Sequence, residues 1–172
     1  MSISKALSAD VKELNALINA AYRGDGSNKG WTTEAHILGG LRVDEAALEK
    51  SLQQEGLTVL KYTDENGAIC GTVTLELKPS LVYLGMFAVW PGLQGKGIGG
   101  ALLQAGVDFA RAHHRSRIVM TVISSRSELI AWYQRQGYVA TGHSIAFEEI
   151  EGRFGDPKVP EIRLIEMEKV IA

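Results

Sequence analysis

The feature that most constrains this chain is a glycine-rich segment between two apolar stretches, Gln94-Gly95-Lys96-Gly97-Ile98-Gly99-Gly100. The stretch before it, 81–90, predicts a buried strand, which Pro91 ends. The stretch after it, 97–114, has apolar residues at helical spacing. A glycine turn at a helix N-terminus exposes backbone N–H groups at the positive end of the helix dipole, and such groups bind phosphate. The segment therefore predicts a site for a phosphorylated ligand.

Size and composition predict a single globular domain, residues 1–172. The chain is 45% apolar and 22% charged, with a net charge of −2, and its length allows a buried core. The basic residues do not cluster, so we expect no nucleic-acid partner. No apolar run is long enough to span a membrane, so we expect no membrane partner. The N-terminus lacks a signal-peptide pattern, and the single cysteine, Cys70, is expected in the core; both indicate a cytoplasmic protein.

The periodicity of the apolar residues predicts an α+β fold with a mixed sheet. Strands are expected at 3–5, 57–62, 68–77, 81–90, 117–123, 138–147 and 161–170, helices after Ser8 and at 31–40, 44–55, 97–114 and 125–136, and loops at 24–30 and 149–160. Ser8 is expected to cap the first helix, and Ser125 and Glu128 to form a capping box at the last. Asn66-Gly67 predicts a hairpin turn, and Gly137 predicts a left-handed helix end.

The glycine-rich segment is open to other interpretations. Gly95, Gly97 and Gly100 satisfy the dinucleotide pattern G-x-G-x-x-G, which by itself is weak. That pattern normally follows the first strand and precedes an acidic residue, whereas here it lies in mid-chain and 115–117 is basic. The pattern of a P-loop is absent. A plain turn without a ligand would not need so many glycines, because each one weakens the start of the helix.

The same segment matches Q/R-x-x-G-x-G/A and resembles the acetyl-CoA pyrophosphate loop of the GNAT superfamily of N-acetyltransferases. Residues 85–91 resemble the fourth strand of that family with its proline exit, and 132–138 resemble its helix-to-strand signature. The resemblance is specific from 57 to 147 and looser before it. It implies a mostly antiparallel sheet of six to seven strands flanked by helices. It also implies acetyl-CoA, as co-substrate, in a splay between the fourth and fifth strands.

The resemblance implies which residues bind the donor. The backbone at Gln94, Gly95, Lys96, Gly97, Ile98 and Gly99 would hold the pyrophosphate, although Lys96 is equally well interpreted as a solvated charge. The pantetheine arm would pair with the backbone at Phe87, Ala88 and Val89, which implies a bulge or splay at 85–86. The Phe87 N–H is the candidate to polarise the thioester carbonyl, a contribution of about 3 kcal/mol.

Tyr133 is implied to face the leaving thiolate. A phenol with a pKa of about 10 is a weaker acid than a thiol with a pKa of about 8.5, so we assign Tyr133 a hydrogen bond to the sulfur rather than full proton transfer. Trp132 is adjacent, and we expect one of these two rings to point away from the core. Many relatives have Asn seven residues before the tyrosine, but this chain has Arg126. Arg126 would contact either a donor phosphate or solvent.

The acceptor side is less defined. The attacking amine must lose a proton, and Glu76 and Glu34 are candidate bases, each also readable as a plain surface carboxylate. The resemblance implies that the early helices wall the acceptor site, here with Tyr22, Trp31, Thr32, Glu34 and Arg42. Arg42 would clamp a carboxylate of an amino-acid-like acceptor, or simply be solvated. The four histidines have no metal-binding spacing, so we expect no metal.

The sequence thus predicts an N-acetyltransferase that moves an acetyl group from acetyl-CoA to a primary amine of a small-molecule acceptor by direct attack. Two alternatives stay open at this point. One is a protein acceptor, either a terminus or a lysine. The other is a non-catalytic acyl-CoA-binding module, against which the presence of Tyr133 argues. The resemblance also allows a homodimer, for which the sequence itself gives no indication.

Overall fold

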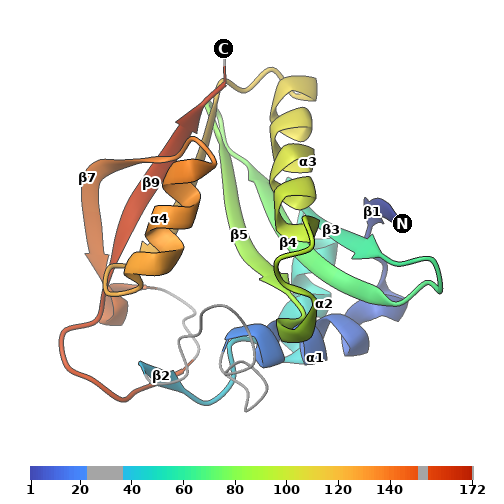
Figure 1. The fold of residues 1–172 in the computed structure, drawn as a ribbon, viewed down its shortest axis with the longest axis horizontal. Coiled ribbons are helices and arrows are strands. Elements are labelled where there is room, and N and C mark those ends of the chain that lie inside the picture. Colours follow the sequence, from blue (N-terminus) through green and yellow to red (C-terminus); the bar gives the residue numbers. More distant parts are fainter. Residues whose placement is uncertain (23–36, 151–154, 172) are drawn as a thin grey trace.

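The computed structural model describes residues 1–22, 37–150 and 155–171 (Figure 1). The helices are α1 (Val11–Tyr22), α2 (Glu45–Gln53), α3 (Ile98–Ala112) and α4 (Ser127–Arg135). The strands are β1 (Ser2–Lys5), β2 (Leu38–Gly39), β3 (Leu57–Thr63), β4 (Ile69–Leu77), β5 (Val82–Val89), β6 (Arg117–Ile123), β7 (Val139–Ala146), β8 (Asp156–Pro157) and β9 (Arg163–Val170). Short 3-10 turns are η1 (Ser8–Asp10), η3 (Pro91–Leu93) and η4 (Phe147–Glu149).

Seven strands form one sheet in the order β1-β3-β4-β5-β6-β9-β7. Only β5 and β6 pair in parallel; the other neighbours in this sheet are antiparallel. The predicted α+β fold with a mostly antiparallel sheet is therefore confirmed. The strands β2 and β8 form a separate antiparallel pair.

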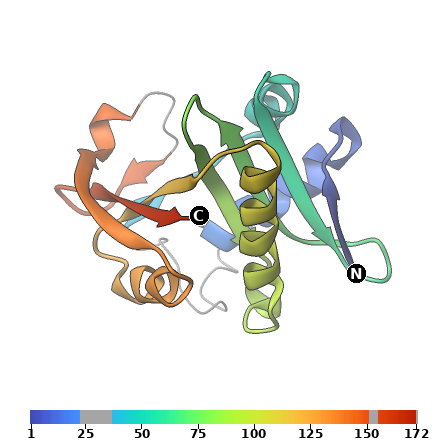
Figure 2. The same cartoon turned by 90° about the horizontal axis from the view of Figure 1, so that it is seen from above.

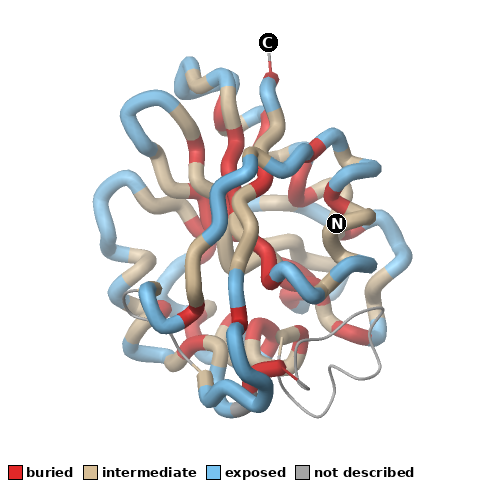
Figure 3. The backbone as a smooth tube through the Cα atoms, turned by 90° about the vertical axis from the view of Figure 1, so that its left-hand side faces the viewer, coloured by how far each residue is buried: buried red, intermediate tan, exposed pale blue. Residues whose placement is uncertain are grey.

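The sheet lies between two layers of helices. Successive strand residues face opposite sides, so Val59 joins the core cluster of α1 while the adjacent Leu60 packs against the cluster of α3. Figure 2 shows α3 and α4 on one side of the sheet and α2 on the other. Buried segments run through the middle of the molecule, and exposed segments form its outer loops (Figure 3). A ligand site that reaches both faces of this sheet must therefore cross the sheet itself.

The sheet opens between β5 and β6. Their register contains only two pairs, Val82↔Ile118 and Tyr83↔Val119, and beyond these the strands have no pairing. Figure 1 shows β5 and β9 close together near the C-terminus and diverging toward the end where α1 lies. From Leu84 onward, the edge of β5 that faces β6 has no partner strand. Its backbone groups are therefore available to something other than the sheet.

A bulge lies on the other edge of β5. Thr72 pairs with Ala88 and Thr74 pairs with Gly85, which leaves Met86 and Phe87 opposite a single residue of β4. Met86 has φ +48°, a conformation that is rare for a residue with a side chain and that concentrates at functional sites. The predicted bulge is present, one residue further along the strand than 85–86.

Local predictions from turn residues are mostly confirmed. Gly67 closes the hairpin turn with φ +82°, and Gly137 ends α4 with φ +96°. Cys70 is 4% exposed and belongs to the main core. Within the described parts of the chain, no helix is both long and apolar enough to cross a membrane.

Two capping predictions were wrong because other groups already satisfy the backbone. Ser8 lies inside η1 and donates its hydroxyl to Glu49 Oε1 at 2.7 Å, while the Asp10 carboxylate accepts from the Leu7 N–H at 2.8 Å. The capping box before α4 does not form. The N-cap is Arg126, whose N–H bonds to the Ile123 carbonyl in a backbone turn at 3.0 Å.

The prediction that a helix extends to residue 40 was also wrong. Residues 31–36 lie outside the described part of the chain, but Leu38 and Gly39 form β2, paired with Pro157 and Asp156. The partner strand β8 lies in the segment 149–160, which we had predicted to be loop. Contacts between segments this far apart in sequence override local helix preference.

Candidate active site

The glycine-rich segment connects β5 to α3 and leaves the start of the helix uncapped. Gly97 is the N-cap of α3 and has φ +85°, a left-handed conformation that favours glycine. It has no side chain that could cap the helix. Within the described chain, no group accepts a hydrogen bond from the backbone N–H groups of residues 95–100. These donors therefore lie, without a protein acceptor, near the positive end of α3.

The start of α3 lies directly against two aromatic rings. A Cβ atom on Gly99 would be 3.2 Å from Phe87 Cζ, closer than ordinary contact, and 3.4 Å from Trp132 Cη2, at the limit of ordinary contact. Glycine at this position therefore lets β5 and α4 approach the helix start. Gly100 differs, since nothing lies within 4 Å of its Cβ position.

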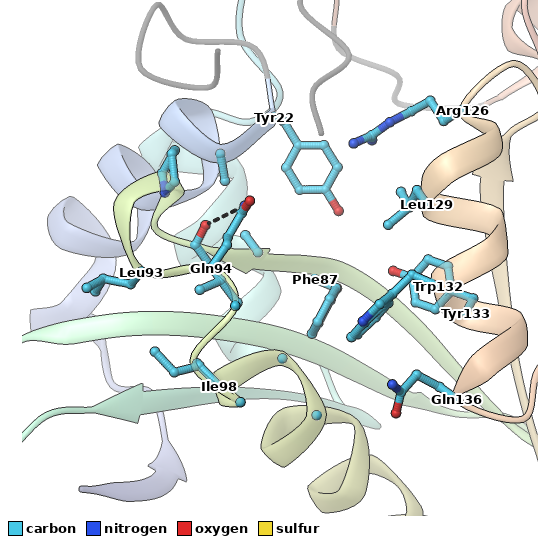
Figure 4. Close-up of a pocket in the computed structure, with 18 of the residues that line it drawn as sticks. Tyr22, Phe87, Leu93, Gln94, Ile98, Arg126, Leu129, Trp132, Tyr133 and Gln136 are labelled. Carbon is cyan, nitrogen blue, oxygen red and sulfur yellow. Dashed lines mark hydrogen bonds between the residues drawn. The ribbon is translucent and has the colours of Figure 1, made fainter. Parts of the chain in front are cut away.

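A cavity of about 720 Å³, here the first cavity, lies beside this helix start (Figure 4). Its wall comes from the ends of α1 and β5, from η3 and the glycine turn, from the start of α3, and from α4. The predicted donor residues that line it are Phe87, Ala88, Val89, Gln94, Gly95, Gly97, Ile98, Gly99, Arg126 and Tyr133. Lys96 is exposed and does not line the first cavity, which favours its interpretation as a solvated charge.

The side chain of Gln94 folds back onto the strand that precedes it. Its Nε2 donates to the Val89 carbonyl oxygen at 3.4 Å, a long hydrogen bond that Figure 4 shows as a dashed line. This contact holds the glycine turn against the end of β5. It also occupies a backbone acceptor that we had assigned to the pantetheine arm, so the Val89 carbonyl is a weaker candidate than Phe87.

Three aromatic rings that line the first cavity pack against one another. The Phe87 and Trp132 ring centroids are 5.8 Å apart and stacked, and the Trp132 and Tyr133 centroids are 5.2 Å apart, edge to face. We had expected Trp132 or Tyr133 to point away from the core, and this was wrong. Adjacent helix residues differ by about 100° rather than 180°, so two long side chains can converge on one cavity.

Burial keeps Tyr133 in its neutral form. The side chain is 5% exposed, and this burial raises its pKa well above the usual value, with a further increase from the nearby Tyr22 and a partly opposing effect of Arg126. At neutral pH the hydroxyl is therefore protonated and able to donate a hydrogen bond. Its raised pKa makes it a still weaker proton donor toward a thiolate.

A second cavity, of about 480 Å³, lies on the face of the sheet that carries α1. Thr74, Glu76, Tyr83 and Thr121 line it as a polar floor contributed by β4, β5 and β6. The Tyr83 hydroxyl and Thr121 Oγ1 are 2.9 Å apart, and Glu76 Oε1 accepts from Lys78 Nζ at 2.9 Å. Glu76, our candidate base, therefore lines this cavity and forms an ion pair with Lys78, and its role as a base stays a prediction.

Arg42 lines the second cavity and is held by α1. Its guanidinium lies over the Tyr22 ring, 5.2 Å from the centroid, in a cation–π contact. Asn19 fixes the backbone beneath it: Asn19 Oδ1 accepts from the N–H groups of Arg42 at 2.7 Å and Val43 at 3.2 Å, and Asn19 Nδ2 donates to the Val43 carbonyl at 2.8 Å. A single amide side chain therefore sets the position of the segment that carries Arg42.

The two cavities meet at shared residues: Tyr22, Phe87, Arg126, Leu129 and Tyr133 line both. Figure 4 shows these side chains around one space, opposite the glycine turn. We call this set the junction. A molecule in the first cavity and another in the second can touch here through the opening between β5 and β6.

Some predicted residues cannot be placed, and other lining residues were missed. Trp31, Thr32 and Glu34 lie outside the described part of the chain. Among the described residues, no group of three His, Cys, Asp or Glu side chains is arranged to hold a metal ion. The junction contains Tyr22, which we had placed only in the general wall of the acceptor site. The role of Asn19 could not be predicted from the sequence, because an asparagine in the middle of a helix belongs to no recognised motif.

Comparison with known proteins identifies the family. The sequence model of the acetyltransferase (GNAT) domain matches residues 34–152, more than half of the chain. The chain therefore belongs to the GNAT acetyltransferase family, and it acts as an acetyl-CoA-dependent N-acetyltransferase. A sequence search of curated proteins finds no match.

Solved structures share the fold over almost the whole chain. The ribosomal-protein-alanine N-acetyltransferase of Brucella melitensis is 22% identical with a TM-score of 0.73, covering 99% of this chain and 100% of that one. The ribosomal-protein-S18-alanine N-acetyltransferase of Escherichia coli is 18% identical with a TM-score of 0.72, covering 99% and 94%. The yncA structure of Salmonella typhimurium, which contains its cofactor acetyl-CoA, is 23% identical with a TM-score of 0.68, covering 100% and 94%. At these identities the likeness supports the fold alone.

Proposed function

We propose that this chain transfers the acetyl group of acetyl-CoA to the primary amine of a small, amino-acid-like acceptor by direct attack. The observation that carries the proposal is the junction, where a cavity on each face of the sheet reaches Phe87 and Tyr133. A donor in the first cavity and an acceptor in the second would meet there, so no acyl-enzyme intermediate is needed. The second cavity has the size of a small-molecule site.

The first cavity fits acetyl-CoA. The free N–H groups of residues 95–100 suit its diphosphate, and the unpaired edge of β5 suits the amide groups of its pantetheine arm. When bound, acetyl-CoA supplies a thioester with a reactive carbonyl carbon. The Phe87 N–H, in the bulge of β5, is our candidate donor to the carbonyl oxygen as negative charge develops on it.

The reaction forms a bond from the amine nitrogen to the carbonyl carbon and breaks the bond from that carbon to sulfur. The amine loses a proton, and the leaving sulfur carries negative charge. We assign the removal of the proton to Glu76, directly or through water, because its carboxylate lines the second cavity. We assign the hydrogen bond to the sulfur to Tyr133, which stays protonated.

A protein acceptor is the alternative. It draws on the similarity in fold to ribosomal-protein-alanine N-acetyltransferases. A peptide terminus differs from a free amino acid in one respect that the site can sense, because its α-carboxyl group is an uncharged amide. The charged group Arg42 in the second cavity favours the free amino acid.

Two measurements test the proposed function. A ligand present at 100 times its dissociation constant stabilises the folded protein by about 2.7 kcal/mol, so millimolar acetyl-CoA should raise the melting temperature by several degrees. Release of free thiol is then measured with a panel of amino acids, other amines and peptides with free N-termini. The proposal is refuted if the melting temperature is unchanged, or if only the peptides release thiol.

A further inference from the structure

The second cavity has two ends of opposite character. One end is apolar and is lined by Leu38, Ile123, Phe147, Ile150 and Leu164, which we call the apolar end. The other end holds Arg42 over the ring of Tyr22. The polar floor of Thr74, Glu76, Tyr83 and Thr121 lines the same cavity. An acceptor that fills this cavity therefore meets both an apolar wall and a cation.

The apolar end belongs to a small hydrophobic cluster of the protein. This cluster is separate from the two larger cores, and it joins β2, the end of β6, η4 and the start of β9. Leu38, Ile123 and Phe147 are 1%, 6% and 4% exposed, so the wall is supported from behind. A supported apolar wall in a cavity favours an apolar group on the ligand, because water is poorly bound there.

Arg42, which we call the cationic end, is held in position by neighbouring residues. The backbone of Arg42 is fixed by Asn19, and the guanidinium is steadied by Tyr22. A guanidinium held in place offers two parallel N–H donors to a carboxylate. Glu76 on the floor carries a carboxylate whose Oε1 is paired with Lys78 Nζ, and this carboxylate can also accept a hydrogen bond from an ammonium group. Arg126, at the junction, is a second guanidinium in this lining. The second cavity therefore offers cations to a carboxylate and one carboxylate to an amine, which can belong to the same molecule.

We propose that the acceptor is a free α-amino acid with a large apolar side chain. Its carboxylate binds Arg42, its side chain packs against the apolar end, and its amine lies at the junction near Glu76. Asn19 acts as a positioning residue through Arg42. The proposal rests on the proposed function and narrows its acceptor to one chemical class.

Four probes separate the features of this class. L-leucine carries all of them, L-leucinamide lacks the carboxylate, glycine lacks the apolar side chain, and L-glutamate replaces the apolar side chain by a charged one. We expect kcat/KM for L-leucine to exceed that for each of the other three by about 30-fold or more, the scale of one charge-assisted hydrogen-bonded contact or one buried side chain. Thiol release with acetyl-CoA is the readout.

The variant Arg42→Gln shows whether the carboxylate is the group that Arg42 recognises. It should lower kcat/KM for L-leucine about 30-fold and leave the rate with L-leucinamide within about threefold. The matched control is Arg111→Gln, an exposed arginine on α3 that lines neither cavity, and it should change neither rate.

The outcomes separate this proposal from the proposed function. Equal use of L-leucine and L-leucinamide, or equal loss with both in Arg42→Gln, overturns the amino-acid acceptor while leaving acetyl transfer intact. Preference for glycine or L-glutamate overturns the apolar part. Thiol release from no amine or peptide at all refutes the proposed function, and this inference with it.

Discussion

The two cavities of this protein are built in different ways. The first cavity has a main-chain part, in the glycine turn at the start of α3 and the unpaired edge of β5, which faces a wall of side chains from α4. The second is made of side chains from β2, β4, β5, β6, η4, β9 and the segment before α2. Backbone groups recognise a phosphate whatever the neighbouring side chains are, whereas side chains recognise one particular molecule. The first cavity therefore suits a ligand common to the family, and the second a ligand specific to this chain.

The strongest test of the main-chain cavity is Gly97→Val. A β-branched residue cannot adopt φ +85° without strain, so the turn would change shape and its N–H groups would separate. Losing two charge-assisted hydrogen bonds, at about 1.5–3 kcal/mol each, should weaken acetyl-CoA binding by about 100-fold or more in calorimetry.

The matched control is Gly67→Val. Gly67 has nearly the same φ, +82°, in the hairpin turn between β3 and β4, and nothing lies within 4 Å of its Cβ position. Both variants should lower the melting temperature by similar amounts, but only Gly97→Val should lose acetyl-CoA. Equal affinity in the two variants would contradict a backbone-built donor site.

The junction is tested by Tyr133→Phe, which removes one hydroxyl and little volume. A hydrogen bond to a charged group contributes about 1.5–3 kcal/mol, so kcat should fall about tenfold or more. Acetyl-CoA affinity should stay within about twofold, because the diphosphate site is elsewhere. The control Tyr62→Phe removes a hydroxyl that contacts Met1 and should leave kcat unchanged. Unchanged turnover in Tyr133→Phe would remove the assignment.

The side-chain cavity is tested through Asn19. Asn19→Ala deletes the hydrogen bonds that hold Arg42 and Val43, and a misplaced clamp should raise the acceptor KM about tenfold. The KM for acetyl-CoA should not change. Asn19→Asp keeps the two acceptor bonds to the Arg42 and Val43 N–H groups and should recover part of the loss. If both KM values rise together, Asn19 has only a structural role.

The smallest expected effect on catalysis is that of a substitution at Tyr138. Its ring packs edge to face against Tyr133, and it lines neither cavity. Its hydroxyl is buried and has no hydrogen-bond partner among the described residues, and burial raises its pKa. Tyr138→Phe should leave kcat unchanged and raise the free energy of unfolding by about 1 kcal/mol, as measured in urea.

The alkaline stability of the protein follows from the same two tyrosines. Both have a higher pKa in the folded state than the unfolded value of about 10, so above that pH the unfolded chain binds fewer protons than the folded one. The free energy of unfolding should therefore be unaffected by these groups below pH 10 and fall above it. Tyr138→Phe should make this fall shallower, and an equally steep fall would contradict the assignment.

The difference between the cavities also explains what the sequence could predict. Residues 94–100 form a contiguous signal, because the turn, its glycines and the helix start are local, and β6 was predicted with its observed bounds. The second cavity depends on contacts between distant segments. Asn19 holds Arg42 from another element, and Leu38 pairs with Pro157, so neither leaves a pattern in the residues around it. The wrong expectations for Ser8 and for Trp132 have local causes instead: Asp10 caps the Leu7 N–H three residues away, and adjacent helix residues differ in direction by only about 100°.

The strand β5 separates from β6 after two residue pairs, and this separation affects how ligands enter and leave the enzyme. Under the proposed placement, the carrier enters from one side of the molecule and the amine from the other. The spent carrier and the acetylated amine then depart by separate exits, and neither has to wait for the other. Substitutions in the second cavity can thus change the acceptor during evolution, while acetyl-CoA binding in the first cavity is preserved.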